Sequence, residues 1–135
     1  MKIANKVLWI LMVLPFVFSS CSNSISEQLK TEMQKLKSQC PMDQGDGVIM
    51  TDVNFYENEK VLEYVCSVEG IEEIDETVTV IMKQAIVDAL GSDLSTFESL
   101  SVKTILNEDY RFRYIYTNTA GKKLCEIDIT KNDLP

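Results

Sequence analysis

The alternation that identifies the fold class runs through Val48–Val68, which reads VIMTDVNFYENEKVLEYVCSV. Apolar and polar residues alternate on both sides of the polar segment 57–60, which is the pattern of two half-buried strands. In the first strand this alternation places Ile49, Val53 and Phe55 on one face. Two such runs joined by four polar residues predict a β-hairpin. A hairpin makes the sheet antiparallel at this point.

An amphipathic helix is predicted before the hairpin. Ser24 and Glu27 have the spacing of a capping box, in which each side chain accepts from a free backbone N–H of the other. An apolar stripe with helical spacing follows, and Pro41 ends it. The stripe consists of Ile25, Leu29, Met33, Leu36 and Cys40.

A second amphipathic helix is predicted after the hairpin. Apolar residues recur at helical spacing from Val78 to Leu90. Asp75 or Thr77 can cap the start of this helix and Gly91 can end it. Three further strands are predicted at about 101–107, 110–117 and 123–130. The order α-β-β-α-β-β-β indicates an α+β fold, with an antiparallel sheet of about five strands and two amphipathic helices on one face.

The start of the chain has a different composition. Lys2 and Lys6 precede an uncharged apolar run over 7–18, and small residues lead to Cys21. This order is typical of a secretory signal. The apolar run has 12 residues, whereas a membrane-spanning helix needs about 20. We therefore expect a lipoprotein signal peptide over 1–20, a short tether over 21–23 and a single α+β domain over 24–135.

Residues 18–21, Phe-Ser-Ser-Cys, resemble the lipobox of bacterial lipoproteins, although Phe18 stands where Leu is usual. The resemblance implies that Cys21 is acylated, becomes the N-terminus and anchors the chain to a membrane. Ordinary signal cleavage beside a chance cysteine is the alternative. Ser22 follows Cys21 in place of the Asp that retains lipoproteins at the inner membrane. The resemblance therefore implies an outer-membrane location facing the periplasm.

The composition excludes most catalytic chemistry. The 135 residues include 21 acidic and 13 basic residues and no histidine, which gives a net charge of −8. Without histidine the common catalytic triads and most zinc sites are lost, and no phosphate-binding glycine loop or nucleophile motif is present. An acidic chain is repelled by phosphate backbones. We therefore expect no enzyme activity, no cofactor, no metal site, no nucleic-acid partner and no small-molecule substrate.

Two groups of residues leave alternatives open. Cys40, Cys66 and Cys125 fall on apolar stripes. They are interpreted as buried small hydrophobes, as one structural disulfide with a thiol left over, or as a reactive or metal-binding thiol. The acidic stretch 69–76 is either a solvated loop that complements the positive end of the second helix or a surface that binds a cation or a basic partner.

The strand over 110–117 provides the candidate binding surface. Its aromatic residues fall on one face and its two arginines fall on the other. The aromatic face is either the contribution of the sheet to the core or an open surface that grips a peptide or a glycan. Arginines beside such a surface would suit an interface hot spot. The candidate binding residues are Tyr110, Arg111, Phe112, Arg113, Tyr114 and Tyr116.

Several features together resemble small, uncharacterised lipoproteins of Gram-negative bacteria. They are the signal with Cys21, then Cys40-Pro41-Met42, Leu62-x-Tyr64, and Tyr114-Ile115-Tyr116 before Gly121-Lys122. In size and element order the chain also resembles the pilotin lipoproteins of type II secretion, which escort outer-membrane secretins by clasping a secretin tail. The resemblance implies a non-enzymatic accessory protein that binds a partner in the envelope. A small periplasmic inhibitor of a hydrolase, with stretch 69–76 entering the active site, is the alternative.

Overall fold

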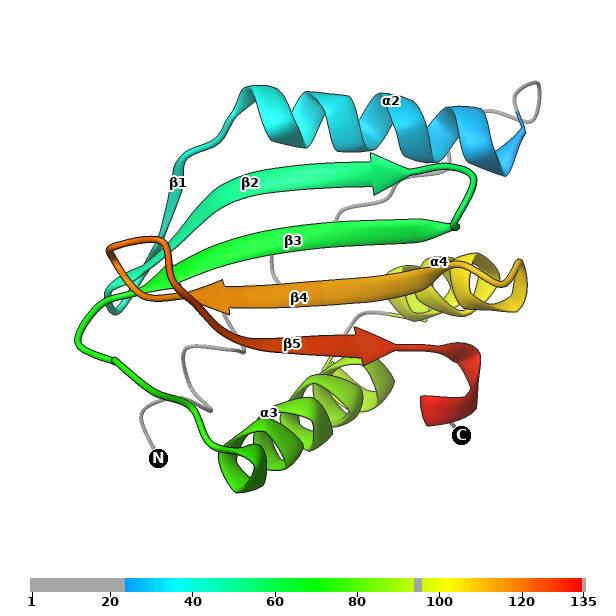
Figure 1. Cartoon of the computed structure of the whole chain (residues 1–135). Helices are drawn as coiled ribbons and strands as arrows, with labels where there is room; N and C mark the ends of the chain where they lie inside the picture. Colours follow the sequence, from blue (N-terminus) through cyan, green and yellow to red (C-terminus); the bar gives the residue numbers. More distant parts are fainter. Residues whose placement is uncertain (1–23, 94–95, 135) are drawn as a thin grey trace.

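The computed structural model of the chain describes residues 24–93 and 96–134. The predicted signal peptide and the whole predicted tether over 21–23, which includes Cys21, lie outside these residues. Five strands form one sheet in the order β1-β2-β3-β4-β5, and helices accompany it (Figure 1). The strands are β1 (Met42–Gly45), β2 (Val48–Tyr56), β3 (Val61–Val68), β4 (Arg111–Thr117) and β5 (Lys123–Ile129), and the helices are α2 (Ile25–Ser38), α3 (Glu76–Asp88) and α4 (Thr96–Asn107). The predicted α+β class with a five-stranded sheet is confirmed.

The pair formed by β3, the middle strand of the sheet, and β4 is parallel. Leu62 of β3 lies opposite Phe112 of β4, and Tyr64 lies opposite Tyr114, whereas the other three strand pairs are antiparallel. Helices α3 and α4 lie between β3 and β4 in the chain, and a helical crossover is the usual way to return a strand in the parallel sense. The prediction of a fully antiparallel sheet is therefore wrong at its centre.

The strand predicted at 101–107 is wrong, because this segment belongs to helix α4. Val102, Ile105 and Leu106 are all buried, and their spacing of three and four is that of a helical stripe. Strand β1, which the sequence did not predict, completes the five strands of the sheet at one edge. A turn at Asp46–Gly47 joins β1 to β2, and both residues have positive φ angles, of 54° and 78°.

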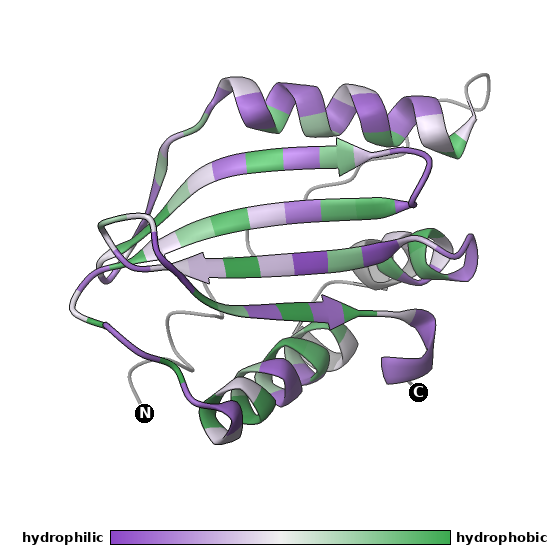
Figure 2. Cartoon of the chain, in the orientation of Figure 1, coloured by the Kyte–Doolittle hydropathy of each residue, from purple (hydrophilic) through white to green (hydrophobic). Residues whose placement is uncertain are grey.

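A bulge in β2 changes which side chains face the core. The register to β3 shifts between Met50 and Asp52, so that the alternation on the two sides of Thr51 is out of phase. Val53 faces the core as predicted, whereas Ile49 is 40% exposed on the opposite face. Along the strands, hydrophilic and hydrophobic residues alternate (Figure 2).

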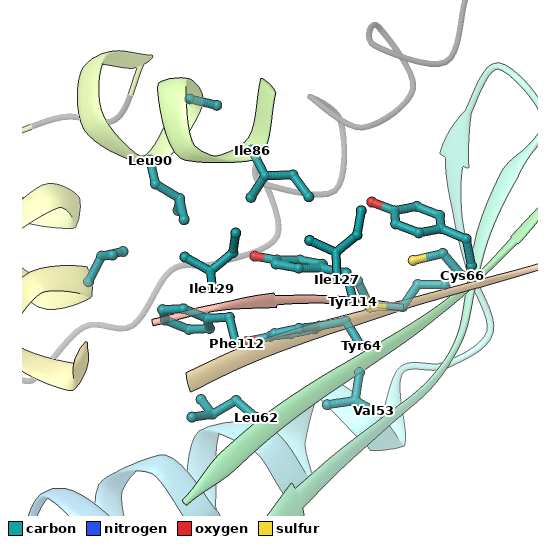
Figure 3. Packing of buried hydrophobic residues seen from close by; sticks show 14 of the residues in the cluster. Val53, Leu62, Tyr64, Cys66, Ile86, Leu90, Phe112, Tyr114, Ile127 and Ile129 are labelled. Atoms are coloured by element: carbon teal, nitrogen blue, oxygen red, sulfur yellow. The ribbon is translucent and has the colours of Figure 1, made fainter. Parts of the chain in front are cut away.

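The core lies between one face of the sheet and the helices. Leu29 and Met33 of α2, and Met82 and Ile86 of α3, are at most 2% exposed. Side chains on neighbouring strands form rows beneath the helices, and Ile86 stands over them (Figure 3). Three rows cross the sheet from β2 to β5: Phe55, Leu62, Phe112 and Ile129; Val53, Tyr64, Tyr114 and Ile127; and Met50, Cys66, Tyr116 and Cys125.

The helix ends agree in part with the sequence. Ser24 Oγ accepts from the Glu27 N–H at 3.2 Å, and Asp75 Oδ1 accepts from the Val78 N–H at 2.8 Å, so both predicted N-caps are confirmed. Gly91 does not end the second helix. The chain continues through a π-helical turn over Ala89–Asp93, in which Ala89 and Leu90 are buried.

Candidate protein-binding surface

One face of the sheet has no helix of the described residues across it (Figure 1). We call it the open face. In the strand registers its residues alternate with those of the core rows. The open face comprises Ile49, Asn54, Tyr56, Glu63, Val65, Arg111, Arg113, Ile115, Glu126 and Asp128.

A row of alternating charge crosses the open face. Asn54 lies opposite Glu63, Glu63 opposite Arg113, and Arg113 opposite Asp128, on four consecutive strands. Arg113 Nε donates to Asp128 Oδ1 at 3.1 Å, and its NH1 lies 3.7 Å from Glu63 Oε2. Opposite charges on directly paired residues stabilise neighbouring strands. The guanidinium of Arg113 therefore connects β4 to both of its neighbouring strands, β3 and β5.

Glu63 is the most buried carboxylate of this row, with 7% of the residue exposed. Its Oε1 accepts from Asn54 Nδ2 at 3.0 Å and from the Tyr56 hydroxyl at 3.3 Å. Burial, followed by the negative charge of Glu63, raises the pKa of Tyr56, so this hydroxyl stays protonated and donates. Because each carboxylate of the row is held by an arginine or by neutral donors, the row supports recognition rather than proton transfer.

The six predicted binding residues are divided between the two faces. Phe112, Tyr114 and Tyr116 are at most 1% exposed and belong to the core, as does Tyr110 at 4%. The interpretation of the aromatic stripe as the sheet's contribution to the core is therefore the one that the structure supports. Only Arg111 and Arg113 lie on the open face, where the side chain of Arg111 is 41% exposed. Their binding role stays a prediction.

Tyr110 is packed between the two turns at one end of the sheet. Its ring stacks on Phe55 with 6.1 Å between the ring centroids, and Lys60 Nζ lies 5.3 Å from its centroid. The same ammonium donates to the Glu108 carbonyl at 2.9 Å. Lys60 therefore joins the β2–β3 turn to the α4–β4 turn, which is a structural role.

The buried tyrosine hydroxyls predict an unusual effect of substitution. Tyr114 and Tyr116 have buried hydroxyls without a hydrogen-bond partner in the described part of the chain. A buried polar group without a partner costs about 1–3 kcal/mol. Tyr114→Phe is therefore expected to raise the free energy of unfolding by about 1 kcal/mol, as measured by urea denaturation.

Tyr64→Phe is the matched control for this prediction. The Tyr64 hydroxyl is equally buried but lies 3.7 Å from Met33 Sδ, a weak acceptor. Its removal should be neutral or slightly destabilising. A loss of stability in Tyr114→Phe of the same size as in Tyr64→Phe would show that the Tyr114 hydroxyl is satisfied.

The cysteines behave as buried apolar residues. Cys40, Cys66 and Cys125 are all free, so the disulfide interpretation has no support in the structure. Burial raises the pKa of the Cys66 thiol to about 12, which makes it unreactive at neutral pH. Cys40 and Cys125 are half-buried, and burial raises their pKa values as well.

The acidic stretch 69–76 is tied to the body of the protein. Asp75 caps α3, Glu76 lies in its first turn, and Asn118 Nδ2 lies 3.4 Å from Glu72 Oε2. Acids at the start of a helix complement its dipole. Ile71 and Ile74 pack against the core. Among the described residues, no group of acids and cysteines is placed to hold a metal ion.

Two hollows open beside the sheet. One of about 280 Å³ lies where Leu106, Tyr110 and Lys131 meet, and the other, of about 240 Å³, lies between α2 and β2 beside Met33 and Phe55. Small-molecule sites have volumes of about 300–1,000 Å³. Both of these hollows fall below this range, so neither has the volume of a typical small-molecule site.

Sequence reasoning missed the partners of the arginines. Glu63, Glu126 and Asp128 are ordinary polar positions of alternating strands, and nothing in their local sequence distinguishes them. Their proximity to Arg113 follows from the pairing of β3 with β4 and of β4 with β5. The opposite charges of Arg113 and Asp128, at equivalent places in neighbouring strands, were the available signal.

The fold defines a class of small α+β proteins in which helices cover one face of a mixed five-stranded sheet. Within this class the chain belongs to the family described as Domain of unknown function (DUF8479), whose model matches residues 24–125. A comparison with curated protein sequences finds no match.

Three solved structures are similar to the chain in fold. The pilotin EpsS from the Vibrio vulnificus type 2 secretion system has a TM-score of 0.57 at 12% identity, over 82% of this chain and 91% of that chain. A putative secreted protein from Pseudomonas aeruginosa has a TM-score of 0.55 at 10% identity, over 83% and 98%. The Vibrio cholerae type II pilotin AspS has a TM-score of 0.49 at 10% identity, over 76% and 85%. At these identities the likeness concerns the fold.

Proposed function

We propose that this protein is a lipid-anchored accessory protein of the outer membrane, which faces the periplasm and binds another envelope protein. The observation that carries the proposal is the open face. An uncovered sheet face with a tyrosine and two paired arginines has the composition of a protein interface. The fold likeness to EpsS supports a place in a secretion system.

A non-enzymatic role suits the chemistry of the described residues. The carboxylates of the open face are already paired, and the thiol of Cys66 is buried. Ile71 and Ile74 hold the acidic stretch against the core, whereas an inhibitory loop would have to project into an active site. These features favour an accessory protein over the alternative of a hydrolase inhibitor.

A secretin is the partner that we infer. Pilotin lipoproteins, which the sequence resembles, escort secretins, and the structure resembles a pilotin of the type 2 system. An uncovered sheet face rich in paired charges offers a broad and nearly neutral contact surface rather than a deep groove. A partner that covers it would bury Ile49 and Tyr56, each 40% exposed.

The proposed anchor is lipid on Cys21. No helix among the described residues is long and apolar enough to cross a membrane. Three residues separate Cys21 from Ile25, where α2 begins, and such a segment spans about 10 Å when extended. Lipid on Cys21 would therefore hold the domain against the membrane surface, within reach of a membrane-embedded partner.

Replacing Cys21 tests the anchor. Cys21→Ser removes the acylated thiol, so the protein should move from the membrane fraction to the soluble periplasmic fraction on cell fractionation. Cys125→Ser is the matched control, because that half-buried thiol lies in β5 and should leave the distribution unchanged. Membrane retention of the Cys21→Ser protein would contradict lipid anchoring.

Photo-crosslinking in cells tests the partner. A photoreactive amino acid at Tyr56 or at Ile49 should give an adduct that mass spectrometry identifies as a secretin. The same group at Lys35, an exposed position of α2, is the control and should give none. A hydrolase in the adducts would favour the inhibitor alternative, and adducts that are equal at all three positions would rule out the open face as the interface.

A further inference from the structure

The two edges of the sheet differ in how they are protected. An unprotected edge strand presents free N–H and C=O groups and can pair with a strand of another chain. At one edge β1 is only four residues long and pairs with β2 near residues 48–50 alone. The rest of β2 lies beside α2 (Figure 1).

Lys37 of α2 seals the uncovered part of β2. Its Nζ donates to the Val53 carbonyl at 3.1 Å, to Asp52 Oδ1 at 2.9 Å and to Asn54 Oδ1 at 2.7 Å. The Val53 carbonyl is therefore already bonded, and the lysine occupies the place of an added strand. A covering helix, a lysine and a bulge are all means by which proteins block strand addition.

Strand β5 forms the other edge, and its one register shift to β4 lies at its start, between the pairs Tyr116–Cys125 and Thr117–Lys123. It is seven residues long, and its register to β4 is regular from Phe112–Ile129 to Tyr116–Cys125. Within residues 24–93 and 96–134, no strand lies on its outer side. Helix α3 reaches β5 from the core side, where Thr79 hydrogen-bonds to Cys125.

The side chains of β5 specify what could pair with it. Leu124, Glu126 and Asp128 point to the open face, and the last two keep 36% and 29% of their side chains exposed. Ile127 and Ile129 point to the core. Arg111, Arg113 and Lys123 already pair with these carboxylates, so a strand added beside β5 would share their exposed oxygens on one face. It would meet apolar residues on the other face, which together suits alternating basic and apolar side chains.

A second copy of the chain is a poor occupant of this edge. Antiparallel self-pairing of β5 centred on Glu126 would place that carboxylate opposite its own copy. Centring on Ile127 would place Glu126 opposite Asp128. Like charges directly opposite each other destabilise paired strands, so the charge pattern favours a different chain with basic residues.

We propose that the outer edge of β5 accepts an extended segment of a partner protein as a sixth strand, with basic residues on the open face and apolar residues toward α3. The proposal deepens the proposed function, because it rests on the presence of a protein partner and names the way in which that partner binds. Main-chain hydrogen bonds would supply affinity and alternate side chains would supply specificity.

A synthetic peptide tests the proposal without any secretion component. The full chain in detergent is mixed with an acetylated, amidated peptide of alternating Lys and Val, and amide hydrogen exchange is followed residue by residue. We expect the peptide to slow the exchange of amides in 123–129. Exchange in 48–56 should stay unchanged, because that edge is sealed. The same peptide with alternate backbone nitrogens methylated, or with Glu in place of Lys, should have no effect.

A charge reversal on β5 supplies the matched variants. Glu126→Lys should weaken peptide binding about five-fold, from the exchange of an attractive for a repulsive cross-strand pair. Glu73→Lys makes the same charge change at an exposed site away from β5 and should leave binding unchanged. Thermal unfolding of both variants shows whether they are folded, and Leu124→Lys serves as a second repulsive variant.

The outcomes separate this proposal from the proposed function. Equal binding of the methylated peptide, protection outside β5, or dimerisation of the protein through β5 in place of peptide binding would overturn strand addition. Those results would not contradict a secretin partner, which the photo-crosslinking experiment tests separately. Adducts with no secretin, together with protection of β5 by the peptide, would overturn the proposed partner and retain the edge site.

Discussion

Phe112→Ala is expected to lower the free energy of unfolding by about 3–5 kcal/mol, the usual cost of removing a buried aromatic ring. Phe112 is 0% exposed and lies between Leu62 and Ile129 in its core row. Small domains have a total stability of about 5–15 kcal/mol. The substitution should therefore lower Tm by about 10–20 °C, measured by circular dichroism.

Ile49→Ala is the control for this substitution. Ile49 is 40% exposed on the open face, and the bulge in β2 places it there. Its truncation should cost less than about 0.5 kcal/mol, as for other surface positions. If Phe112→Ala also cost less than about 1 kcal/mol, the aromatic stripe would be an exposed surface, and the interpretation of this face as core would be wrong.

The elements that the sequence predicts correctly are those with a local cause. The hairpin of β2 and β3 follows from two alternating runs around a polar turn. Helix α3 follows from apolar spacing together with the Asp75 cap. In each case neighbours in the sequence carry the whole signal, and tertiary contacts do not have to override it.

The sequence did not predict helix α4 because the local pattern of residues fits a strand as well as a helix. Residues 101–107 contain the β-branched Val102, Thr104 and Ile105, which favour strands by propensity. Only burial of Val102, Ile105 and Leu106 on one side selects the helix. Once 96–107 is helical, β3 and β4 are separated by a crossover, and their parallel pairing follows.

The sequence predicted which face of β4 each candidate residue occupies, but not which residues of the neighbouring strands it pairs with. The sequence correctly separated Arg111 and Arg113 from the aromatic face, because a strand alternates whatever its neighbours are. It could not identify Glu63 as the residue opposite Arg113, since 49 residues separate them and register across a crossover has no local signal. The protection of one sheet edge by Lys37 depends on tertiary structure in the same way.

Arg113→Met is expected to destabilise the protein by about 2–3 kcal/mol at pH 7, although methionine retains the apolar stem. The guanidinium lies 3.1 Å from Asp128, 3.7 Å from Glu63 and 3.9 Å from Glu126. Without it, the partners of Glu63 among the described residues are the neutral donors Asn54 and Tyr56, and Glu63 is 7% exposed. Removing one partner of a buried pair leaves an uncompensated charge, which costs more than the pair itself contributes.

The loss should depend on pH. A hydrogen bond from Lys123, opposed by partial burial and aided by Arg113, lowers the pKa of Glu126 below its usual 4.5. A carboxylate with a lowered pKa contributes stability above its unfolded pKa and loses that stability as pH falls through its folded pKa. The difference between Arg113→Met and the unsubstituted protein, measured by urea denaturation, should therefore shrink below about pH 4.

Two further variants isolate the cause of this loss. Lys123→Met removes an exposed ion pair to Glu126 and should cost less than about 1 kcal/mol. The double variant Arg113→Met with Glu63→Leu removes both the charge and its stranded partner, so it should recover much of the lost stability. If Arg113→Met cost no more than Lys123→Met at any pH, the charged row would not stabilise the sheet, and the open face would hold its arginines for contact with a partner alone.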